Sequence, residues 1–571
     1  MGTQAEYEAP PGFGDHKQNN YSLNFNIERV NMDKRNFTSL TPQYKFSDTL
    51  EEQKSQLKDN PLLQRMLKAR LDISTDPYRP IFHYVNPENT LNDPNGLCYW
   101  QGRWHLFYQA YPPEDPRQHW GHAVSEDLIH WEDLPYAIYP NPEERCFSGS
   151  TLVEEDRVIA MYHGTDAGNM VAVSKDPLLL NWEKLTGKAV IPIPEQDGSP
   201  QEYTVFDPCI WSKDGKYYSL SGGTLQTNPG GVRRAADFLF RSNDLIHWEY
   251  LHPFTEGDIF TLAGDDGACP YFWPIGDKHI LLFYSHMSGG QYLLGDYDLG
   301  RDKFSVISGG LFNFGASTPS GVHAPSATPD GLGGVVAIFN MNPGMETKGW
   351  NQIMTLPRLL TLEEDSVLKI KPAGDIESLR YDHKHVGDTV LPPNEEIVLD
   401  KIEGNTIEII AEIDAKASPM VELNVLRSKT REEYTRITFF KNRGFRITEW
   451  GDKTGALLQS GNTVVSPYGT PRSIPYRQSV LSIDSSYSSV LPGALSRPPE
   501  TTAIDLGADE PLKLRIFIDR SVVEVFVNDK ACAAVRVYPG LSDSTGVSIR
   551  AQGSEARLLA LDAWKMGNIY E

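Results

Sequence analysis

One short motif occurs three times in the first half of the chain, and it constrains the fold more than any other feature of the sequence. Ser125-Glu-Asp-Leu-Ile-His-Trp-Glu132 returns as Ser242-Asn-Asp-Leu-Ile-His-Trp-Glu249, and a degenerate copy spans residues 174–183. The tryptophans of successive copies are 51 and 66 residues apart. Strand-rich repeats of roughly 40–50 residues are typical of propeller blades, and loop insertions lengthen the spacing. The repeat therefore predicts a β-propeller.

The surrounding sequence is typical of an all-β protein with many turns. From about residue 80 to 360, short β-prone runs such as Trp104–Tyr108 and His279–Tyr284 alternate with Gly, Pro, Asn and Asp. The chain has 11 Trp, 26 Tyr and 23 Phe beside 47 Gly and 40 Pro, which also suits a protein that stacks rings on sugars. Roughly 280 residues accommodate five blades better than seven. We predict a five-bladed propeller over residues 80–365.

A short helical extension is predicted before the propeller, in residues 1–79. Residues 1–45 form a polar arm without sustained apolar periodicity. Helix signals follow, because Thr49-x-x-Glu52 resembles a capping box and Asn60-Pro61 supplies a cap and a first-turn proline.

A second β region follows the propeller, and we predict a β-sandwich over residues 390–571. Alternating runs occur at Thr406–Ile413 and Arg436–Phe440. Leu512–Ile518 and Val523–Val527 predict a hairpin with one buried face. The predicted fold class is therefore all-β, a five-bladed β-propeller followed by a C-terminal β-sandwich.

The charge balance excludes several classes of partner. The chain carries 53 Lys and Arg against 76 Asp and Glu, a formal net charge of −23. Because like charges repel, this acidity argues against nucleic acid and anionic membrane as partners, and no apolar run is long enough to span a bilayer. The five cysteines form no C-x-x-C pair and the histidines no H-E-x-x-H pattern, so we expect no metal site and no cofactor.

Three carboxylate-bearing turns are the candidates for chemistry. Asp93 lies in Leu91-Asn-Asp-Pro-Asn-Gly96, Asp207 in Val205-Phe-Asp-Pro-Cys209, and Asp265 and Asp266 in Gly264-Asp-Asp-Gly-Ala-Cys-Pro270. Each sequence is also a typical turn, which is the plainer interpretation. If the turns belong to successive blades, however, the carboxylates could converge on the propeller axis.

These motifs resemble glycoside hydrolase family 32, the group of invertases, inulinases and levanases. The resemblance runs from about Phe82 to the C-terminus. It rests on Asn92-Asp-Pro-Asn-Gly96, Phe107-Tyr-Gln109, Trp120-Gly-His122, Phe147-Ser-Gly-Ser150, Phe206-Asp-Pro208, Cys269-Pro270, Leu356-Pro-Arg358, Asp519-Arg-Ser521 and Val523-Glu-Val-Phe526. It implies a five-bladed propeller followed by a β-sandwich, and a disaccharide or oligosaccharide substrate.

The resemblance also implies a role for each matched residue. Asp93 would be the nucleophile that forms a covalent glycosyl-enzyme with a fructofuranosyl unit, and Asp207 would bind sugar hydroxyls and stabilise the transition state. Such chemistry needs a second carboxyl that protonates the leaving oxygen and later activates water. The pocket for the terminal fructose would be lined by Asn92, Gln109, Phe147 and Ser148, with Trp120 as a stacking wall. We assign Trp131 and Trp248 to the blade cores instead.

The chain departs from the family at the position of the acid/base, where Ala268 stands in place of the glutamate before Cys269-Pro270. An alanine cannot transfer a proton. Two interpretations follow: an engineered inactive variant, or a natural substitution in which a neighbouring group acts. Asp266 and Asp265 are the nearest candidates in sequence, with Glu256 more distant. We predict Asp266 as the catalytic residue and Asp265 as a substrate-binding residue.

A second departure is Phe206, where the family has an arginine before Asp207-Pro208. The arginine would offer donors to sugar hydroxyls, so its loss leaves the sugar open. We predict a retaining glycosidase of β-fructofuranosides such as sucrose or fructan. The alternatives are a fructosyltransferase, an enzyme acting on another furanoside such as an arabinofuranoside, and a carbohydrate-binding protein with decayed catalysis.

The histidines, the first residues and the N-terminal extension support three further expectations. His122 and His286 could contact sugar, although a structural role is the commoner one for a single histidine. Residues 1–20 lack the pattern of a signal peptide, which favours a cytoplasmic protein, or a secreted one if a leader was removed. The N-terminal extension is additional to the family core and could join chains into a homo-oligomer.

Overall fold

The structure is a computed structural model that describes residues 37–194, 202–226, 233–363, 367–441, 458–460, 463–465, 471–473, 479–504, 506–507 and 509–570. Most of the predicted polar arm, residues 1–36, lies outside the described residues.

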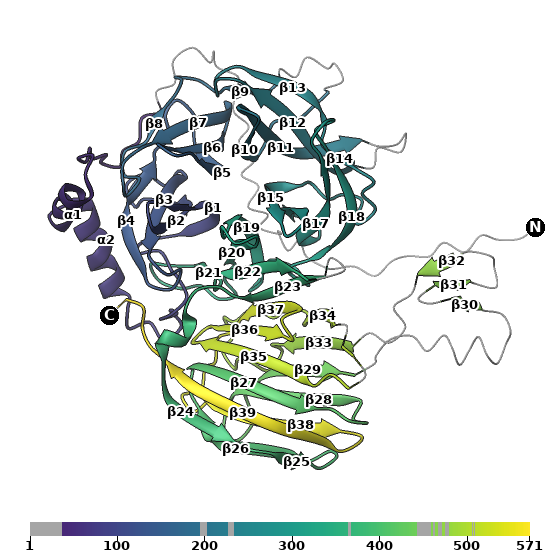
Figure 1. Cartoon of the computed structure of the whole chain (residues 1–571). Coiled ribbons are helices and arrows are strands. Elements are labelled where there is room, and N and C mark those ends of the chain that lie inside the picture. Colours follow the sequence, from purple (N-terminus) through teal and green to yellow (C-terminus); the bar gives the residue numbers. More distant parts are fainter. Residues whose placement is uncertain are drawn as a thin grey trace, which may run out of the picture. The chain divides into compact units, whose positions relative to one another are not determined.

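Within the described residues, the predicted propeller is present as five sheets arranged around a centre (Figure 1). The first sheet is β1 (Leu91–Trp100), β2 (Arg103–Ala110), β3 (His119–Ser125) and β4 (Trp131–Ile138). The second is β5 (Cys146–Val153), β6 (Val158–Gly164), β7 (Gly168–Ser174) and β8 (Glu183–Lys184), with β9 (Ile191–Pro192) paired to β7. The third is β10 (Pro208–Lys213), β11 (Lys216–Gln226), β12 (Arg233–Ser242) and β13 (Trp248–Pro253).

The fourth and fifth sheets close the propeller. The fourth is β15 (Ala268–Ile275), β16 (Lys278–Ser285), β17 (Gly289–Asp298) and β18 (Lys303–Leu311), with β14 (Thr255–Glu256) at its edge. The fifth is β19 (Val322–Pro329), β20 (Val335–Met341), β22 (Arg358–Leu362) and β23 (Leu368–Pro372), with β21 (Ile353–Met354) beside β20. The first strand of each sheet contacts the first strand of the next, so β1, β5, β10, β15 and β19 form an inner ring.

The two close copies of the repeated motif form the same tight turn. Asp127 accepts hydrogen bonds from the backbone N–H groups of Ile129 (2.9 Å) and His130 (2.8 Å) and contacts the His130 ring nitrogen at 2.7 Å. Asp244 makes the corresponding three bonds in the second copy. The leucine after each aspartate has a positive φ, 70° and 67°. The motif therefore encodes the turn that leads into the outermost strand of a blade, β3 to β4 and β12 to β13.

Two helices precede the first blade, as the helix signals predict. They are α1 (Leu50–Lys58) and α2 (Pro61–Asp72), and the Asn60 side chain accepts a hydrogen bond from the backbone N–H of Leu63 at 3.0 Å. Helix α2 contacts β4, where Arg70 pairs with the buried Asp133 at 2.7 Å. In the part of the chain that the structure describes, no helix is long and apolar enough to cross a membrane.

The C-terminal β-sandwich has two main sheets. One contains β24 (Arg380–Val386), β39 (Ala556–Met566), β27 (Thr406–Asp414), β35 (Leu512–Asp519), β36 (Val522–Val527) and β37 (Ala531–Arg536), with β25 (Thr389–Leu391) on β39. The other contains β26 (Glu396–Glu403), β38 (Gly546–Gln552), β28 (Met420–Arg427), β29 (Thr435–Phe440), β33 (Ser479–Asp484) and β34 (Glu500–Ile504). A separate small sheet contains β30 (Leu458–Ser460), β31 (Thr463–Val465) and β32 (Pro471–Ser473). A 3₁₀ turn, Ile376–Leu379, precedes β24, so the sandwich strands begin at Arg380, before residue 390.

The hairpin β35–β36 forms as expected but is buried on both faces, which corrects the prediction of one buried face. Ile516 and Val525 pack into the sandwich core. Phe517, Val522 and Phe526 belong instead to a cluster that also contains residues of the propeller. The second face is therefore covered by the other domain, which strand alternation alone does not reveal.

A buried group of charges joins the propeller to this hairpin. His83 contacts Asp519 at 2.9 Å and Glu524 at 3.2 Å, and Arg358 contacts Glu524 at 3.2 Å. All four side chains are fully buried. Burial opposes a charge on His83, but the two carboxylates outweigh it and raise the pKa of His83 to about 9. The C-terminal motifs that resemble the family thus belong to the junction of the two domains.

Candidate active site

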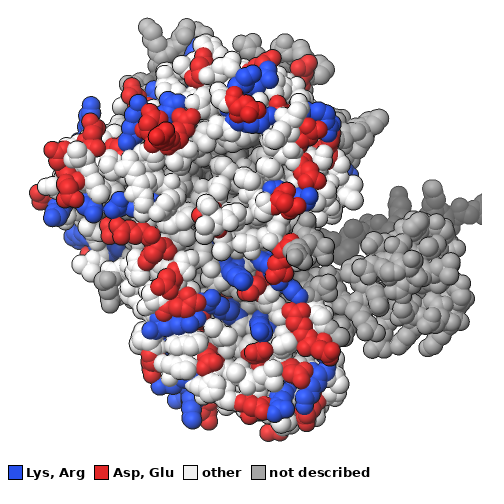
Figure 2. Space-filling model, viewed as in Figure 1, with Lys and Arg blue, Asp and Glu red and all other residues white. Residues whose placement is uncertain are grey.

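A cavity of about 150 Å³ brings together side chains from the inner strands of the propeller. It is lined by Asn92, Asp93, Gln109, Gln118, Phe147, Ser148, Phe206, Asp207, Ala268, Cys269, Tyr284, His286 and His323. In the space-filling view, charged side chains of both signs lie around the edge of the propeller and over the sandwich (Figure 2). The concentration of carboxylates and imidazoles inside the cavity makes it the candidate active site.

β-Bulges aim the side chains at the cavity. The pairing register shifts near the start of four inner strands, at Asp93 in β1, at Phe147 and Ser148 in β5, at Cys269 in β15 and at His323 in β19. A bulge inserts an extra residue and redirects its side chain. Each of these residues lines the cavity. The fifth inner strand, β10, begins immediately after Asp207.

Asp93 is held as a carboxylate. Its Oδ2 accepts hydrogen bonds from Ser148 Oγ at 2.9 Å and Gln109 Nε2 at 3.2 Å, and its Oδ1 lies 3.0 Å from His323 Nδ1. Burial raises the pKa of a carboxyl group, but at Asp93 the nearby His323 and these hydrogen bonds outweigh burial and lower the pKa below its usual value. An ionised, oriented carboxylate is the state that a nucleophile requires.

The pKa of Asp207 is shifted in the opposite direction from that of Asp93. Burial raises the pKa of Asp207 to about 7, and the negative charge of Asp93 adds to the rise. The backbone N–H of Cys269 donates to Asp207 Oδ2 at 3.0 Å. The Cys269 thiol lies 3.4 Å from Asp207 Oδ2 and 3.8 Å from Asp93 Oδ2, and Cys269 has a positive φ of 49°. The two carboxyl groups therefore share one wall of the cavity with their pKa values pushed apart, as in sites that assign two carboxyls to different roles.

At the position of the missing acid, a histidine and an aspartate stand together. Ala268 at the start of β15 pairs with Tyr284 in β16. Two residues further on, His286 Nδ1 contacts Asp266 Oδ2 at 2.6 Å, and the His286 backbone N–H donates to Asp266 Oδ1 at 3.1 Å. The hydrogen bond to Asp266 raises the pKa of His286.

Asp265 is not placed to act on a substrate. Its carboxylate is buried and accepts hydrogen bonds from its own loop and from the turn between β16 and β17: Leu262 N, Ser285 Oγ, Ser288 Oγ and Gln291 Nε2. It does not line the cavity. Glu256 lies in β14 and pairs with Arg301 at 2.6 Å. Both carboxylates are thus engaged in structural contacts.

The residues predicted to line the fructose pocket fall into two groups, those that line the cavity and those that do not. Asn92, Gln109, Phe147 and Ser148 line the cavity, where Asn92 Nδ2 donates to Gln109 Oε1 at 3.2 Å. Trp120 does not, because it is fully buried in a blade core and donates Nε1 to the Phe147 carbonyl at 2.9 Å. The expected stacking wall is therefore a support beneath the cavity, and this corrects the assignment of Trp120.

Tyr284, His286 and His323 are among the cavity residues that the sequence analysis did not assign to the site. Tyr284 and His323 lie with their ring centroids 4.2 Å apart, and Tyr284 and His286 with theirs 5.3 Å apart. Of the three, His286 alone was considered as a sugar contact. No local sequence signal identifies them, because their position depends on the register of β16 against β15, the strand that begins at Ala268.

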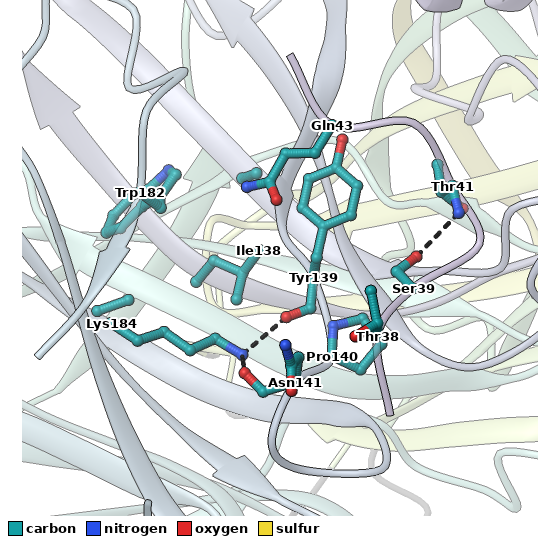
Figure 3. A pocket seen from close by; sticks show the side chains of 12 residues that line it. Thr38, Ser39, Thr41, Gln43, Ile138, Tyr139, Pro140, Asn141, Trp182 and Lys184 are labelled. Atoms are coloured by element: carbon teal, nitrogen blue, oxygen red, sulfur yellow. Dashed lines mark hydrogen bonds between the residues drawn. The ribbon is translucent and has the colours of Figure 1, made fainter. Parts of the chain in front are cut away.

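A second cavity, of about 360 Å³, lies between the segment 38–43 and the second blade (Figure 3). Lys184, which lines this cavity, donates hydrogen bonds from Nζ to the carbonyls of Tyr139 and Asn141, each at 2.7 Å, and contacts Glu143 at 2.5 Å. Among the described residues that line it, none carries a carboxyl group. We therefore place the chemistry in the smaller cavity.

Comparison with protein families matches both halves of the chain. The model of the glycosyl hydrolases family 32 N-terminal domain matches residues 83–372. The model of the glycosyl hydrolases family 32 C-terminal domain matches residues 375–565.

Individual proteins resemble the chain over most of its length. Fructan 6-exohydrolase of Beta vulgaris is 26% identical over 86% of this chain and 87% of its own. Sucrose-6-phosphate hydrolase of Escherichia coli is 27% identical over 86% of this chain and 95% of its own. Among solved structures, a variant of fructan 1-exohydrolase IIa from Cichorium intybus, in complex with 1-kestose, has a TM-score of 0.69 and 22% identity, covering 86% of this chain and 98% of its own.

Proposed function

The chain belongs to glycosyl hydrolases family 32, and from this premise we propose that it is a retaining glycosidase that cleaves β-fructofuranosides such as sucrose, fructo-oligosaccharides or fructan. Relatives at 26% and 27% identity carry fructan and sucrose-phosphate hydrolase names. The observation that carries the proposal is Asp93, whose pKa is lowered, in a cavity that is also lined by a second carboxyl with a raised pKa, Asp207.

Asp93 acts as the nucleophile in this proposal. Its Oδ1 or Oδ2 attacks the anomeric carbon of the fructosyl unit, the bond to the leaving oxygen breaks, and a glycosyl ester forms. Ser148 and Gln109 hold the carboxylate in place, so little reorganisation is needed before attack.

Asp207 binds the fructosyl ring beside the nucleophile. With its pKa raised to about 7, it donates a hydrogen bond to a hydroxyl when protonated and accepts one when ionised. The amide groups of Asn92 and Gln109 supply further donors and acceptors in the same cavity. Water is the acceptor in hydrolysis, and a second sugar in its place would give fructosyl transfer.

Phe206 supports a second candidate, an enzyme for another furanoside such as an arabinofuranoside. It lines the cavity where the family has an arginine, and its ring lies 5.1 Å from the His163 ring. This places an apolar surface where a charged donor would otherwise meet sugar hydroxyls.

The test is product release from a panel of sugars. We expect free fructose from at least one of sucrose, 1-kestose, inulin and levan, and a loss of at least about 10³-fold in kcat/KM for Asp93→Asn, which keeps the side-chain volume. Fructose release by Asp93→Asn at the wild-type rate would remove Asp93 from the mechanism. Turnover of aryl arabinofuranosides without any fructose release would favour the second candidate, and sugar binding without turnover would favour a binding protein.

A further inference from the structure

The proposed reaction needs a proton donor, and the residue at position 268 cannot supply one. Departure of an alkoxide from a sugar is slow unless its oxygen is protonated as the bond breaks. Ala268 has no titratable group, Asp265 is enclosed by hydrogen bonds, and Glu256 is paired with Arg301. Asp207 lies beside the nucleophile and is assigned to the sugar ring. The donor must therefore be sought elsewhere in the cavity.

His286 stands where such a group is needed. It follows β16 directly, and Tyr284, the residue that pairs with Ala268, lies two positions before it. Residues two apart on a strand point to the same side, and both Tyr284 and His286 line the cavity. The His286 ring lies 6.3 Å, centroid to centroid, from the His323 ring that contacts Asp93.

Asp266 orients this histidine. It binds His286 Nδ1 at 2.6 Å and the backbone N–H of the same residue at 3.1 Å, which leaves Nε2 as the nitrogen available to a substrate. Nε2 makes no hydrogen bond to the described part of the chain, and the His286 side chain is 58% exposed. A carboxylate that holds one imidazole nitrogen while the other exchanges a proton is a common arrangement for a general acid or base.

We propose that His286, positioned by Asp266, is the general acid and base of this enzyme in place of the carboxyl that is absent at position 268. The inference rests on the proposed function. In the first step Asp93 attacks the anomeric carbon, the glycosidic C–O bond breaks, and the leaving oxygen keeps its electron pair and takes the proton from His286 Nε2. In the second step neutral His286 accepts a proton from water, the water oxygen attacks the anomeric carbon, and the ester bond to Asp93 breaks to restore the carboxylate.

The electrostatics around His286 agree with this cycle. The groups that face it are the carboxylates of Asp266, Asp93 and Asp207 and the rings of Tyr284 and His323. Asp266 raises the pKa of His286, burial opposes the rise, and Asp93 and Asp207 add to it. These carboxylates therefore stabilise the imidazolium relative to a histidine in water before substrate reacts. When Asp93 becomes an ester its charge disappears, which lowers the pKa of His286 and suits a base in the second step.

The experiment compares two leaving groups in the full-length protein. Sucrose, or the β-fructoside cleaved fastest in the panel, needs protonation of its leaving oxygen, whereas β-fructofuranosyl fluoride releases fluoride without a proton donor. We expect His286→Gln to lower kcat/KM for the sugar by about 10²–10⁴-fold and for the fluoride by less than tenfold. His247→Gln is the matched control, because His247 forms the same kind of pair with Asp244 at 2.7 Å on the surface, and it should leave both rates unchanged.

Two further variants separate catalysis from structure. Asp266→Asn should move the basic limb of the kcat/KM profile for the sugar to lower pH, because the imidazolium loses its partner charge. Ala268→Glu in the His286→Gln background should restore sugar cleavage with a basic limb at lower pH than in the wild type.

The outcomes distinguish this inference from the proposed function. Equal losses on both substrates in His286→Gln, or no loss on either, would overturn the role of His286 while Asp93 remained the nucleophile. Wild-type protein that cleaves β-fructofuranosyl fluoride but not the sugar would show that no proton donor operates, and would also overturn the role of His286. Wild-type protein that cleaves neither substrate would overturn the proposed function and this inference together.

Discussion

Asp93 and Asp207 line the same cavity, but the pKa of Asp93 is lowered and that of Asp207 is raised. The cause is the difference between their nearest neighbours. His323, Ser148 and Gln109 stabilise the charge on Asp93. Burial of Asp207 outweighs the hydrogen bond from the backbone N–H of Cys269 and the smaller contribution of His286, and Asp207 also faces the charge of Asp93. The cavity thus contains a buried carboxyl whose ionised form the folded protein disfavours.

Because burial disfavours ionised Asp207, we predict that replacing this residue raises the stability of the fold and lowers the activity. Because the folded state raises the pKa of Asp207 to about 7 from an ordinary value of 3.8, it retains a proton that the unfolded chain loses, so this group destabilises the fold progressively as pH rises from about 4 to 7. We expect Asp207→Asn to raise the free energy of unfolding at pH 8 by about 1–3 kcal/mol and to lower kcat/KM at least 10²-fold. Urea unfolding at pH 8 and pH 4 checks this, since the gain should shrink at pH 4. A variant less stable at pH 8 would contradict it.

Phe206 allows a specificity test at the same scale. Phe206→Arg would place charged donors in the cavity, and a hydrogen bond from a charged group contributes about 1.5–3 kcal/mol. We expect kcat/KM for the β-fructoside to rise about tenfold relative to an aryl arabinofuranoside. Phe206→Leu is the control, because it removes the ring without adding a donor, and the ratio of the two substrates should not shift toward fructoside. An equal gain in both variants would assign the effect to lost bulk.

At the scale of elements, the repeated motif places an aspartate at a turn in three blades, but the degenerate copy in the second blade differs in its hydrogen bonds and in its burial. In the second blade, Asp176 accepts from the backbone N–H groups of Leu180 and Asn181, each at 2.9 Å, and from Gln53 Nε2 of helix α1 at 2.6 Å. Asp176 is buried, whereas Asp244 in the third blade lies on an exposed turn. The copy in the second blade thus also attaches the helical extension to the propeller.

Because Asp176 is buried and Asp244 is exposed, replacing each by alanine should lower the free energy of unfolding by different amounts. Asp176→Ala leaves several buried donors without an acceptor and should lower the free energy of unfolding by about 2–4 kcal/mol. Asp244→Ala removes the equivalent bonds in solvent and should cost clearly less. The urea midpoints of the two variants measure this, and limited proteolysis should cut near α1 faster in the first alone. Equal midpoints would mean that the contact between α1 and the second blade adds no stability.

At the scale of the whole molecule, the junction between propeller and sandwich depends on charges that have no contact with solvent. His83 links the start of the propeller to Asp519 and Glu524, and Arg358 reaches Glu524 from the fifth blade. Removing one member of a buried charged group leaves its partners uncompensated, which typically costs about 3–5 kcal/mol. The sandwich is thus joined to the propeller by electrostatics as well as by the apolar face of β35 and β36.

The raised pKa of His83 gives this junction a pH dependence. The folded value of about 9 exceeds the ordinary 6.5, so the folded protein binds a proton that the unfolded chain releases. The stabilisation is complete below about pH 6.5 and is lost as pH rises through 9. We expect the melting temperature to fall between pH 6.5 and 9.5, and His83→Gln to be less stable at pH 6.5 and to show a smaller fall. A His83→Gln variant whose fall matches that of the wild type would refute this.

The sequence by itself determined the family, the all-β class and the propeller followed by a sandwich, all of which are confirmed. It could do so because the repeat encodes a local turn and strand alternation is a local property. It also pointed to Asp93 and Asp207, whose roles remain proposals, because each carboxylate lies in a short motif of its own.

Only the tertiary structure decided how those residues are used. Trp120 supports the cavity from below and Asp265 is enclosed, because burial depends on neighbours from other strands. The hairpin β35–β36 is buried on both faces over most of its length, because a different domain covers Phe517, Val522 and Phe526. His286 meets Asp266 across two strands, twenty residues apart in sequence. Proximity of this kind is set by strand register and blade closure, which no local pattern of residues contains.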